Sequence, residues 1–201
     1  TVGAYGSAFG AAAVSADFTV LQTCLLSLLL FSGASQFAVV GVIAAGGTAL
    51  SAIATSTLLG TRNGLYGLRL APLLKLHGWR RVIAAQITID ESTGVALAQN
   101  NEEDMKKGFW YTGFGVFFFW NLFTLAGALG AQAIGNPSAW GLDAAVPAAF
   151  IGLLWPRLTD PKSWVLAGLA IVLALSFTPF VPAGVPIISS ALLAIIIGWR
   201  R

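Results

Sequence analysis

Cysteine and histidine are nearly absent from this chain, which contains one of each, Cys24 and His77. A disulfide within the chain, a cysteine-rich metal site and a multi-histidine metal centre are therefore excluded. Charge is also scarce, because Asp, Glu, Lys and Arg make up 9% of the residues, against about a quarter in soluble domains. A soluble fold of this length could not cover its surface with so few polar groups.

Sequence signatures of catalysis are missing as well. The chain has no P-loop, no HExxH, no glycine-rich dinucleotide motif and no spare histidine for a Ser/His/Asp set. We therefore expect a protein that is not an enzyme, with no catalytic residue, no metal and no cofactor. RNA-binding, zinc-finger and basic-helix patterns are missing too, so no nucleic-acid partner is expected.

What the chain has in abundance is apolar sequence. Hydrophobic residues make up 57% of 201 residues, and the mean hydropathy is +0.81. The apolar runs are continuous rather than alternating, which favours helices over a membrane barrel. We predict an all-α, polytopic membrane helix bundle of roughly six to eight segments in the lipid bilayer. Residues 1–201 are expected to form a single domain whose first segment is clipped at its start.

Charged and Gly/Pro-rich stretches separate the apolar runs and so define the expected segments. They are Val2–Val14, Phe18–Gly47, Thr48–Leu74, Val82–Gln99, Gly108–Gln132, Ala144–Trp155, Trp164–Phe180 and Val185–Trp199. Gly3, Gly6 and Gly10 lie along the first segment, and small residues of this kind let membrane helices approach closely. The aromatic stretch Phe114–Trp120 is expected to face lipid or to pack against other helices.

The basic loops raise a question of topology. Basic loops should share the cytoplasmic side, but a single crossing by Val82–Gln99 would place Lys75–Arg81 opposite the later basic sites. Our hypothesis is that Val82–Gln99 is re-entrant or broken. In the alternative, Glu102, Glu103 and Asp104 mark a true outside loop and another segment is misread.

Two adjacent carboxylates, Asp90 and Glu91, lie near the middle of Val82–Gln99. Charges in lipid are costly, and buried acids are typical of proton relays or of sites for a substrate amine. We take both as candidates for proton coupling. Alternatively, the acids are solvated at the membrane surface or pair with arginines.

Arg62, Asn63 and Tyr66 form the second candidate site, in a glycine-rich stretch. The planar guanidinium of Arg62 suits a carboxylate, and Tyr66 shares its face of a continuous helix. The alternative is that Arg62 pairs with Asp90 or Glu91 as a structural strut. Arg69 is expected to snorkel towards the loop.

The third candidate site is the polar interruption of a long apolar run at Ser32, Gly33, Ser35 and Gln36. A helix that restarts there would point its backbone N–H groups at an anion. The alternative is close packing of helices through small residues.

These motifs together resemble the AzlC family, the large subunits of branched-chain amino acid exporters. The stretches that carry the resemblance are Ala4–Gly10, Leu30–Phe37, Arg62–Leu70, the pair Asp90-Glu91, and the later region 143–154 with Pro147 and Phe150. The resemblance covers nearly the whole chain.

The resemblance implies a secondary transporter that exports hydrophobic amino acids across a bacterial inner membrane, driven by protons. It also implies a small membrane subunit of the AzlD type as partner. Gly60 and Asn63 stand where the family usually carries Asn and His, and Ile89 stands where it usually carries Thr. A transporter or channel for another small solute therefore stays open, as does a non-transporting membrane scaffold.

Overall fold

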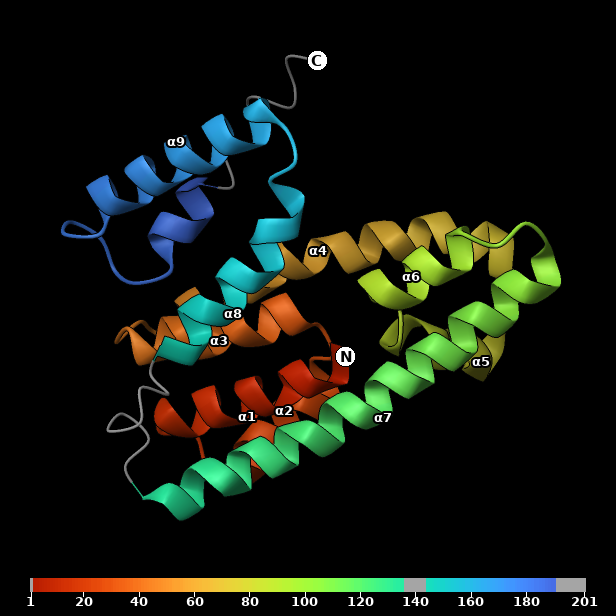
Figure 1. The fold of residues 1–201 in the computed structure, drawn as a ribbon, viewed down its shortest axis with the longest axis horizontal. Coiled ribbons are helices and arrows are strands. Elements are labelled where there is room, and N and C mark those ends of the chain that lie inside the picture. The colour runs from red at the N-terminus through yellow and green to blue at the C-terminus, as the bar shows by residue number, and fades with distance from the viewer. Residues whose placement is uncertain (1, 136–143, 191–201) are drawn as a thin grey trace.

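The computed structural model describes residues 2–135 and 144–190, and within these ranges all regular structure is helical (Figure 1). A short 3₁₀ helix, η1, precedes α1, and another, η4, lies between α8 and α9. The elements are η1 (Val2–Ala4), α1 (Tyr5–Ser15), α2 (Val20–Leu29), α3 (Gly33–Ala44), α4 (Ala49–Leu74), α5 (Gly78–Gln86), α6 (Asp90–Leu97), α7 (Glu102–Ile134), α8 (Ala145–Leu154), η4 (Trp155–Arg157) and α9 (Pro161–Phe177). The expected all-α class is confirmed for the described residues.

Helix α7 is the longest element, at 33 residues, or about 50 Å at 1.5 Å per residue. Its start is well specified, because the Asn101 side chain accepts a hydrogen bond from the Asp104 N–H at 2.8 Å. Acidic residues fill the first turn, where the helix dipole favours negative charge. The helix ends at Ile134, and the next residue, Gly135, has a φ of 79°, which suits glycine.

Glycine contacts hold α1 against α7. A Cβ on Gly6 or Gly10 would collide with the α7 backbone at Trp120 or Thr124, and a Cβ on Gly127 would collide with the carbonyl of Ser7. The predicted role of the first glycine stripe is therefore confirmed. Figure 1 shows α1 lying beside α7, with α2 alongside.

Two of the expected apolar segments are broken helices. The run Phe18–Gly47 divides at Leu30–Ser32 into α2 and α3, and Val82–Gln99 divides after Gln86 into α5 and α6. The Gln86 side chain donates to the carbonyl of Leu28 at 2.8 Å, so it links the two breaks. The break in Val82–Gln99 is confirmed, whereas a re-entrant path stays a prediction.

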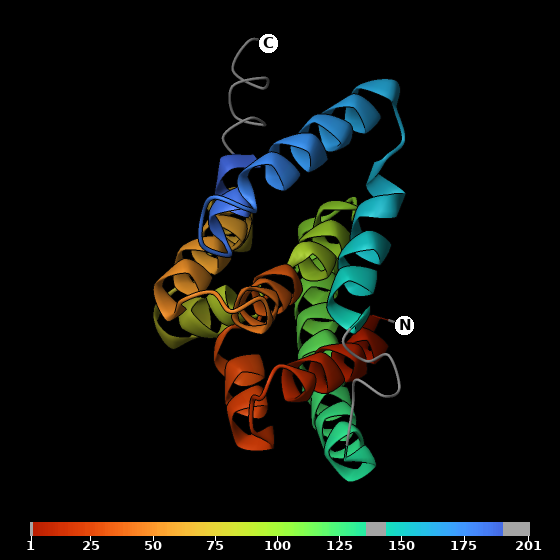
Figure 2. The ribbon, with the colours of Figure 1, turned by 90° about the vertical axis from the view of Figure 1, so that its left-hand side faces the viewer.

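The number of membrane spans stays a prediction. Within the described ranges, α7 is the one helix both long and apolar enough to cross a membrane, and α2, α3 and α9 are apolar but shorter. Most of the expected segment Val185–Trp199 lies outside the described residues. Its described part, residues 185–190, is helical. Figure 2 shows α9 extending away from α1 and α7, and α9 has no buried residue.

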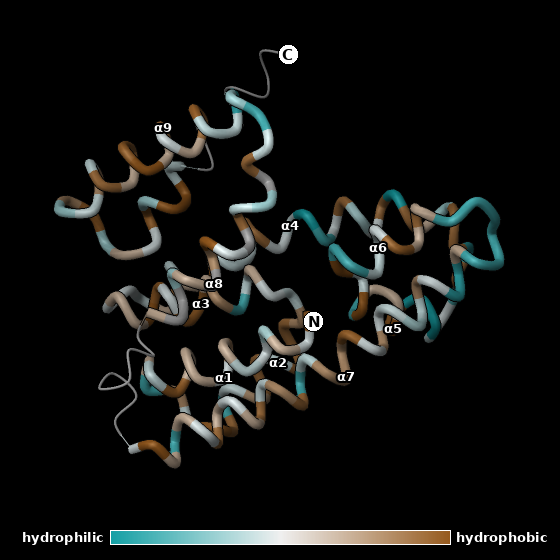
Figure 3. Tube along the Cα trace, in the orientation of Figure 1, coloured by the Kyte–Doolittle hydropathy of each residue, from teal (hydrophilic) through white to brown (hydrophobic). Residues whose placement is uncertain are grey.

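Several polar side chains are fully buried, while many large apolar side chains are exposed. Thr23, Ser27, Gln36, Thr55 and Thr124 have no solvent exposure, whereas α2, α7 and α9 expose large apolar side chains. Hydrophilic residues gather instead around α5, α6 and the start of α7 (Figure 3). Such a surface suits contact with lipid rather than water.

Candidate functional site

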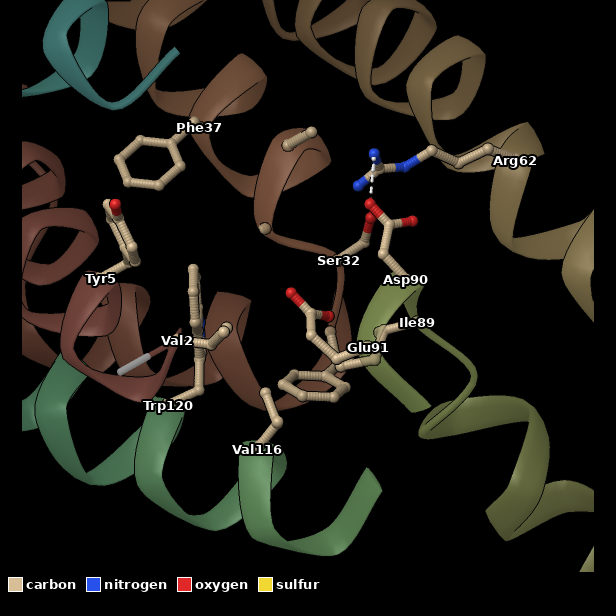
Figure 4. A pocket seen from close by; sticks show the side chains of 13 residues that line it. Val2, Tyr5, Ser32, Phe37, Arg62, Ile89, Asp90, Glu91, Val116 and Trp120 are labelled. Atoms are coloured by element: carbon tan, nitrogen blue, oxygen red, sulfur yellow. Dashed lines mark ion pairs between the residues drawn. The ribbon is translucent and has the colours of Figure 1, made fainter. Parts of the chain in front are cut away.

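A cavity of about 100 Å³ lies where the starts of α3 and α6 meet the middle of α4 (Figure 4). Side chains of η1, α1 and α7 complete its wall. The lining residues are Val2, Tyr5, Phe31, Ser32, Gly33, Ala34, Phe37, Arg62, Ile89, Asp90, Glu91, Val116 and Trp120. The cavity therefore combines a charged side with an apolar side.

An ion pair forms the charged side. Arg62 Nη1 lies 2.9 Å from Asp90 Oδ2, and the two side chains are 32% and 27% exposed. The pair joins the middle of α4 to the first residue of α6, and Figure 4 shows it at the edge of the cavity. Arg62 Nε is buried without a hydrogen-bond partner among the described residues. This geometry supports the alternative in which Arg62 is a structural partner of Asp90. A ligand that separated the two side chains would meet one positive and one negative group.

The starts of two helices face this cavity. Helix α3 begins at Gly33, and Ser32 makes no side-chain cap bond there; its hydroxyl donates to Ser35 Oγ at 3.2 Å. The first backbone N–H groups of a helix have no intrahelical acceptor and attract anions. The start of α3 therefore adds positive potential beside Arg62.

Helix α6 presents carboxylates at its start instead. Asp90 and Glu91 occupy its first turn, where the helix dipole attracts negative charge. Ser92 supports this start, because its Oγ accepts from the Ile89 N–H at 3.1 Å and donates to the Ile87 carbonyl at 2.7 Å. The break before α6 thus places the side chains of Asp90 and Glu91 at the cavity. Helix α6 itself contains no lysine or arginine.

Aromatic and aliphatic side chains form the apolar side. Phe37 packs edge-on against Phe9, with ring centroids 5.6 Å apart, and Phe31 packs similarly against Phe117 at 4.9 Å. Trp120 is buried, and its Nε1 has no hydrogen-bond partner among the described residues. These contacts hold the apolar side in place.

The structure gathers part of the predicted set at this cavity. Ser32, Gly33, Arg62, Asp90 and Glu91 line it. Residues from the three candidate sites, which are far apart in sequence, therefore meet at one place.

Other members of the predicted set do not line the cavity. Ser35 is fully buried and donates to the Ser56 carbonyl at 3.0 Å. Gln36 is also fully buried, and its Nε2 donates to the Ser27 carbonyl at 3.3 Å. Asn63 and Tyr66 are partly buried elsewhere on α4, and Arg69 is exposed, as expected for a residue that snorkels.

The sequence interpretation missed the contribution of α1 and α7. In the sequence, Val116 and Trp120 lie within the aromatic stretch Phe114–Trp120, and Tyr5 lies within the glycine-rich stretch Ala4–Gly10. Neither stretch was predicted to line a site. A signal existed, because Gly113, Trp120, Thr124 and Ala128 follow helical spacing and mark the buried face of α7. Phe114, Phe118 and Phe119 on the other faces are exposed, as the lipid-facing prediction requires.

An apolar outer surface around a charged cavity is typical of membrane proteins that handle polar solutes. A family model described as AzlC protein matches residues 1–134, which end with the last residue of α7. The chain therefore belongs to the AzlC family. The family carries a membrane, transport-related function. No curated protein and no solved structure matches the chain.

Proposed function

We propose that this chain is the large subunit of a secondary transporter that exports branched-chain or other hydrophobic amino acids. The observation that carries the proposal is the cavity, which places Arg62 and Asp90 2.9 Å apart beside an apolar wall. An amino acid zwitterion requires a cation, an anion and an apolar slot. In this proposal the chain forms a single domain in a bacterial inner membrane. It moves a solute and catalyses no reaction.

The two charges suit the two ends of the substrate. The substrate carboxylate accepts hydrogen bonds from the Arg62 guanidinium and from the first N–H groups of α3. The substrate ammonium pairs with Asp90 or Glu91. Binding exchanges one ion pair for two and leaves the net charge unchanged, which limits the cost of burying charge in a membrane protein.

The apolar side of the cavity receives the substrate side chain. Phe31, Phe37 and Ile89 carry no hydrogen-bonding group in their side chains, and Trp120 carries only the indole N–H. This wall therefore suits an aliphatic side chain. Valine, leucine, isoleucine and methionine differ by one or two methylene-sized groups, and one such group changes preference by only about 1–3 kcal/mol. We therefore expect several hydrophobic amino acids to share the site.

Proton coupling follows from competition at the carboxylates. A carboxylate at α6 accepts either the substrate ammonium or a proton, so occupancy by one excludes the other. Exchange of the two across a membrane links proton entry to amino acid exit. Ser35, Gln36, Asn63 and Tyr66 remain proposed substrate contacts in a second conformation, because alternating access rearranges helices around a fixed site.

The partner in this proposal is a small membrane subunit of the AzlD type. The exposed apolar surface of the chain supports a partner within the bilayer, because α7 and α9 leave large side chains uncovered. The efflux experiment below tests whether transport requires this small subunit.

The test is efflux of labelled valine, leucine and methionine from cells that express the chain alone or with the small subunit. We expect efflux that requires both chains and that collapses with a protonophore. Arg62→Gln should abolish it, whereas Arg69→Gln, an exposed arginine of the same helix, should not. Efflux of other solutes only would support the alternative transporter. A scaffold would move no solute and would keep cysteines placed at Ser32 and Gly33 dry.

A further inference from the structure

A second hollow lies between the C-terminal half of α4 and α5. Its volume is about 420 Å³, and apolar residues such as Leu70, Leu74 and Ala84 form its floor. Gly64 and Gly67 lie along its α4 wall, and a Cβ on either would meet nothing within 4 Å. We call this hollow the basic groove, because of the residues at its mouth.

Basic side chains line one part of the basic groove. Lys75, His77 and Arg81 line it there and are all exposed. The acid that faces them is Glu102 of α7, which lies 3.2 Å from Lys75 Nζ and 2.7 Å from Lys106 Nζ. Glu102 is thus shared between two lysines, and Arg81 forms no ion pair with any described residue. The mouth keeps a net positive charge.

We propose that the basic groove binds an anionic phospholipid. Its phosphodiester accepts hydrogen bonds from the Arg81 guanidinium and the Lys75 ammonium, and one acyl chain lies along the glycine face of α4. Charge complementarity favours this occupant, because an arginine presents a planar set of donors to phosphate oxygens. The glycines leave room for a chain of methylene groups where a helix of ordinary side chains would close the space.

The location of the groove suits a lipid for a second reason. If Val82–Gln99 is re-entrant, the loop Lys75–Arg81 shares the cytoplasmic side with the other basic loops, and anionic headgroups concentrate on that side. Trp79 lies beside the mouth and is 75% exposed, as is typical of aromatic residues at the membrane interface. The groove therefore presents its cations at headgroup level and its apolar floor towards the hydrocarbon.

The experiment compares lipid retention by native mass spectrometry of the purified full chain. Phosphatidylglycerol and phosphatidylcholine with the same acyl chains are titrated separately, and glycerol phosphate is added as a competitor without acyl chains. We expect the chain to retain phosphatidylglycerol in preference to phosphatidylcholine. Arg81→Gln should weaken that retention about fivefold, because one cation near an anionic headgroup contributes about 1 kcal/mol.

Two further variants make the test specific. Arg80→Gln removes an equal charge from the neighbouring exposed residue, which does not line the groove, and should leave retention unchanged. Gly67→Leu fills the groove without changing charge and should weaken retention as strongly as Arg81→Gln. Equal retention of both lipids, or equal loss in Arg80→Gln and Arg81→Gln, would overturn the site. Displacement of the lipid by glycerol phosphate would show that the acyl chain does not contribute to binding. A cysteine at Gly67 that crosslinks to a protein instead of a lipid would show that a protein, and not a phospholipid, occupies the groove.

Discussion

At the residue scale, the ion pair between Arg62 and Asp90 is the feature that most needs an explanation. The two side chains are about one third exposed or less, so their pairing is neither a surface contact nor a fully buried one. Exposed pairs contribute little to stability, and loss of one partner from a buried pair is costly because it strands the other charge. A structural strut and a binding site therefore make different predictions for the same substitutions.

Arg62→Gln alone should lower the free energy of unfolding by about 1–2 kcal/mol, a value between those of exposed and buried pairs. The double variant Arg62→Gln/Asp90→Asn should recover most of that loss, because no charge is left stranded. Thermal unfolding of the purified protein in detergent measures both.

Amino acid binding separates the two roles of this pair. If Arg62 contacts the substrate, the double variant is stable but does not bind leucine in isothermal calorimetry. A double variant that regains both stability and binding would make the pair a strut alone. Glu103→Gln is the control, since Glu103 lies on the exposed first turn of α7 and pairs with Lys107, away from the cavity.

Asp90 and Glu91 carry the coupling prediction. Asp90→Asn and Glu91→Gln cannot exchange a proton, so each should reduce the dependence of efflux on the pH gradient. Counterflow of labelled leucine against unlabelled leucine should survive in at least one of them, because exchange of substrate requires no net proton movement. Full pH-dependent export in both variants would contradict the coupling role.

At the element scale, the contact of α1 with α7 fixes which face of α7 reaches the cavity. Gly127 meets the Ser7 backbone, whereas Gly130, one turn later on the same helix, faces open space. The two glycines provide a matched pair for testing close helix approach.

Gly127→Ala should destabilise the protein by about 1–3 kcal/mol, because the added methyl group has no room beside the Ser7 backbone. Gly130→Ala should be neutral or stabilise by up to about 1 kcal/mol, since alanine is the better helix former. Thermal unfolding in detergent compares them. Equal effects of the two substitutions would contradict the close contact.

Sequence patterns predicted the elements of the site better than its walls. The break before Gly33 was predictable, because small and polar residues interrupt an apolar run that is too long for one span. The break before Asp90 was predictable from the placement of charge. Trp120 was harder to predict, because the stretch around it is rich in apolar residues and only the helical spacing of Gly113, Trp120 and Thr124 marks the buried face of α7. Gln36 stays a predicted substrate contact, although in this structure its Nε2 donates to the Ser27 carbonyl of α2 and the residue does not line the cavity.

At the scale of the whole molecule, the outer surface is apolar and the interior carries polar side chains. Ser27, Gln36 and Thr124 are fully buried around the contact of α2, α3 and α7. In water this arrangement would be unfavourable, because burying polar groups costs free energy and exposing apolar surface gains none. In a bilayer the apolar surface is matched by lipid tails, and hydrogen bonds between helices help to hold the interior together.

A matched pair of aromatic residues tests this orientation. Phe118 lies at the middle of α7 and is 62% exposed, and Trp79 lies at the start of α5 and is 75% exposed. In a soluble protein, Phe118→Lys and Trp79→Lys would both be tolerated, since each lysine would meet water. In a membrane protein, Phe118→Lys places a charge deep in hydrocarbon at about 2.5–3.5 kcal/mol on insertion scales, while Trp79→Lys stays at the headgroups.

We therefore expect Phe118→Lys to reduce the amount of chain integrated into membranes several-fold and Trp79→Lys to leave it near the wild-type level. Carbonate extraction of membranes, followed by quantification of the chain in pellet and supernatant, measures the difference. Equal recovery of both variants in the pellet would mean that α7 does not present this face to lipid. In that case a partner helix covers Phe118, and crosslinking from a cysteine at that position in the complex with the small subunit would identify it.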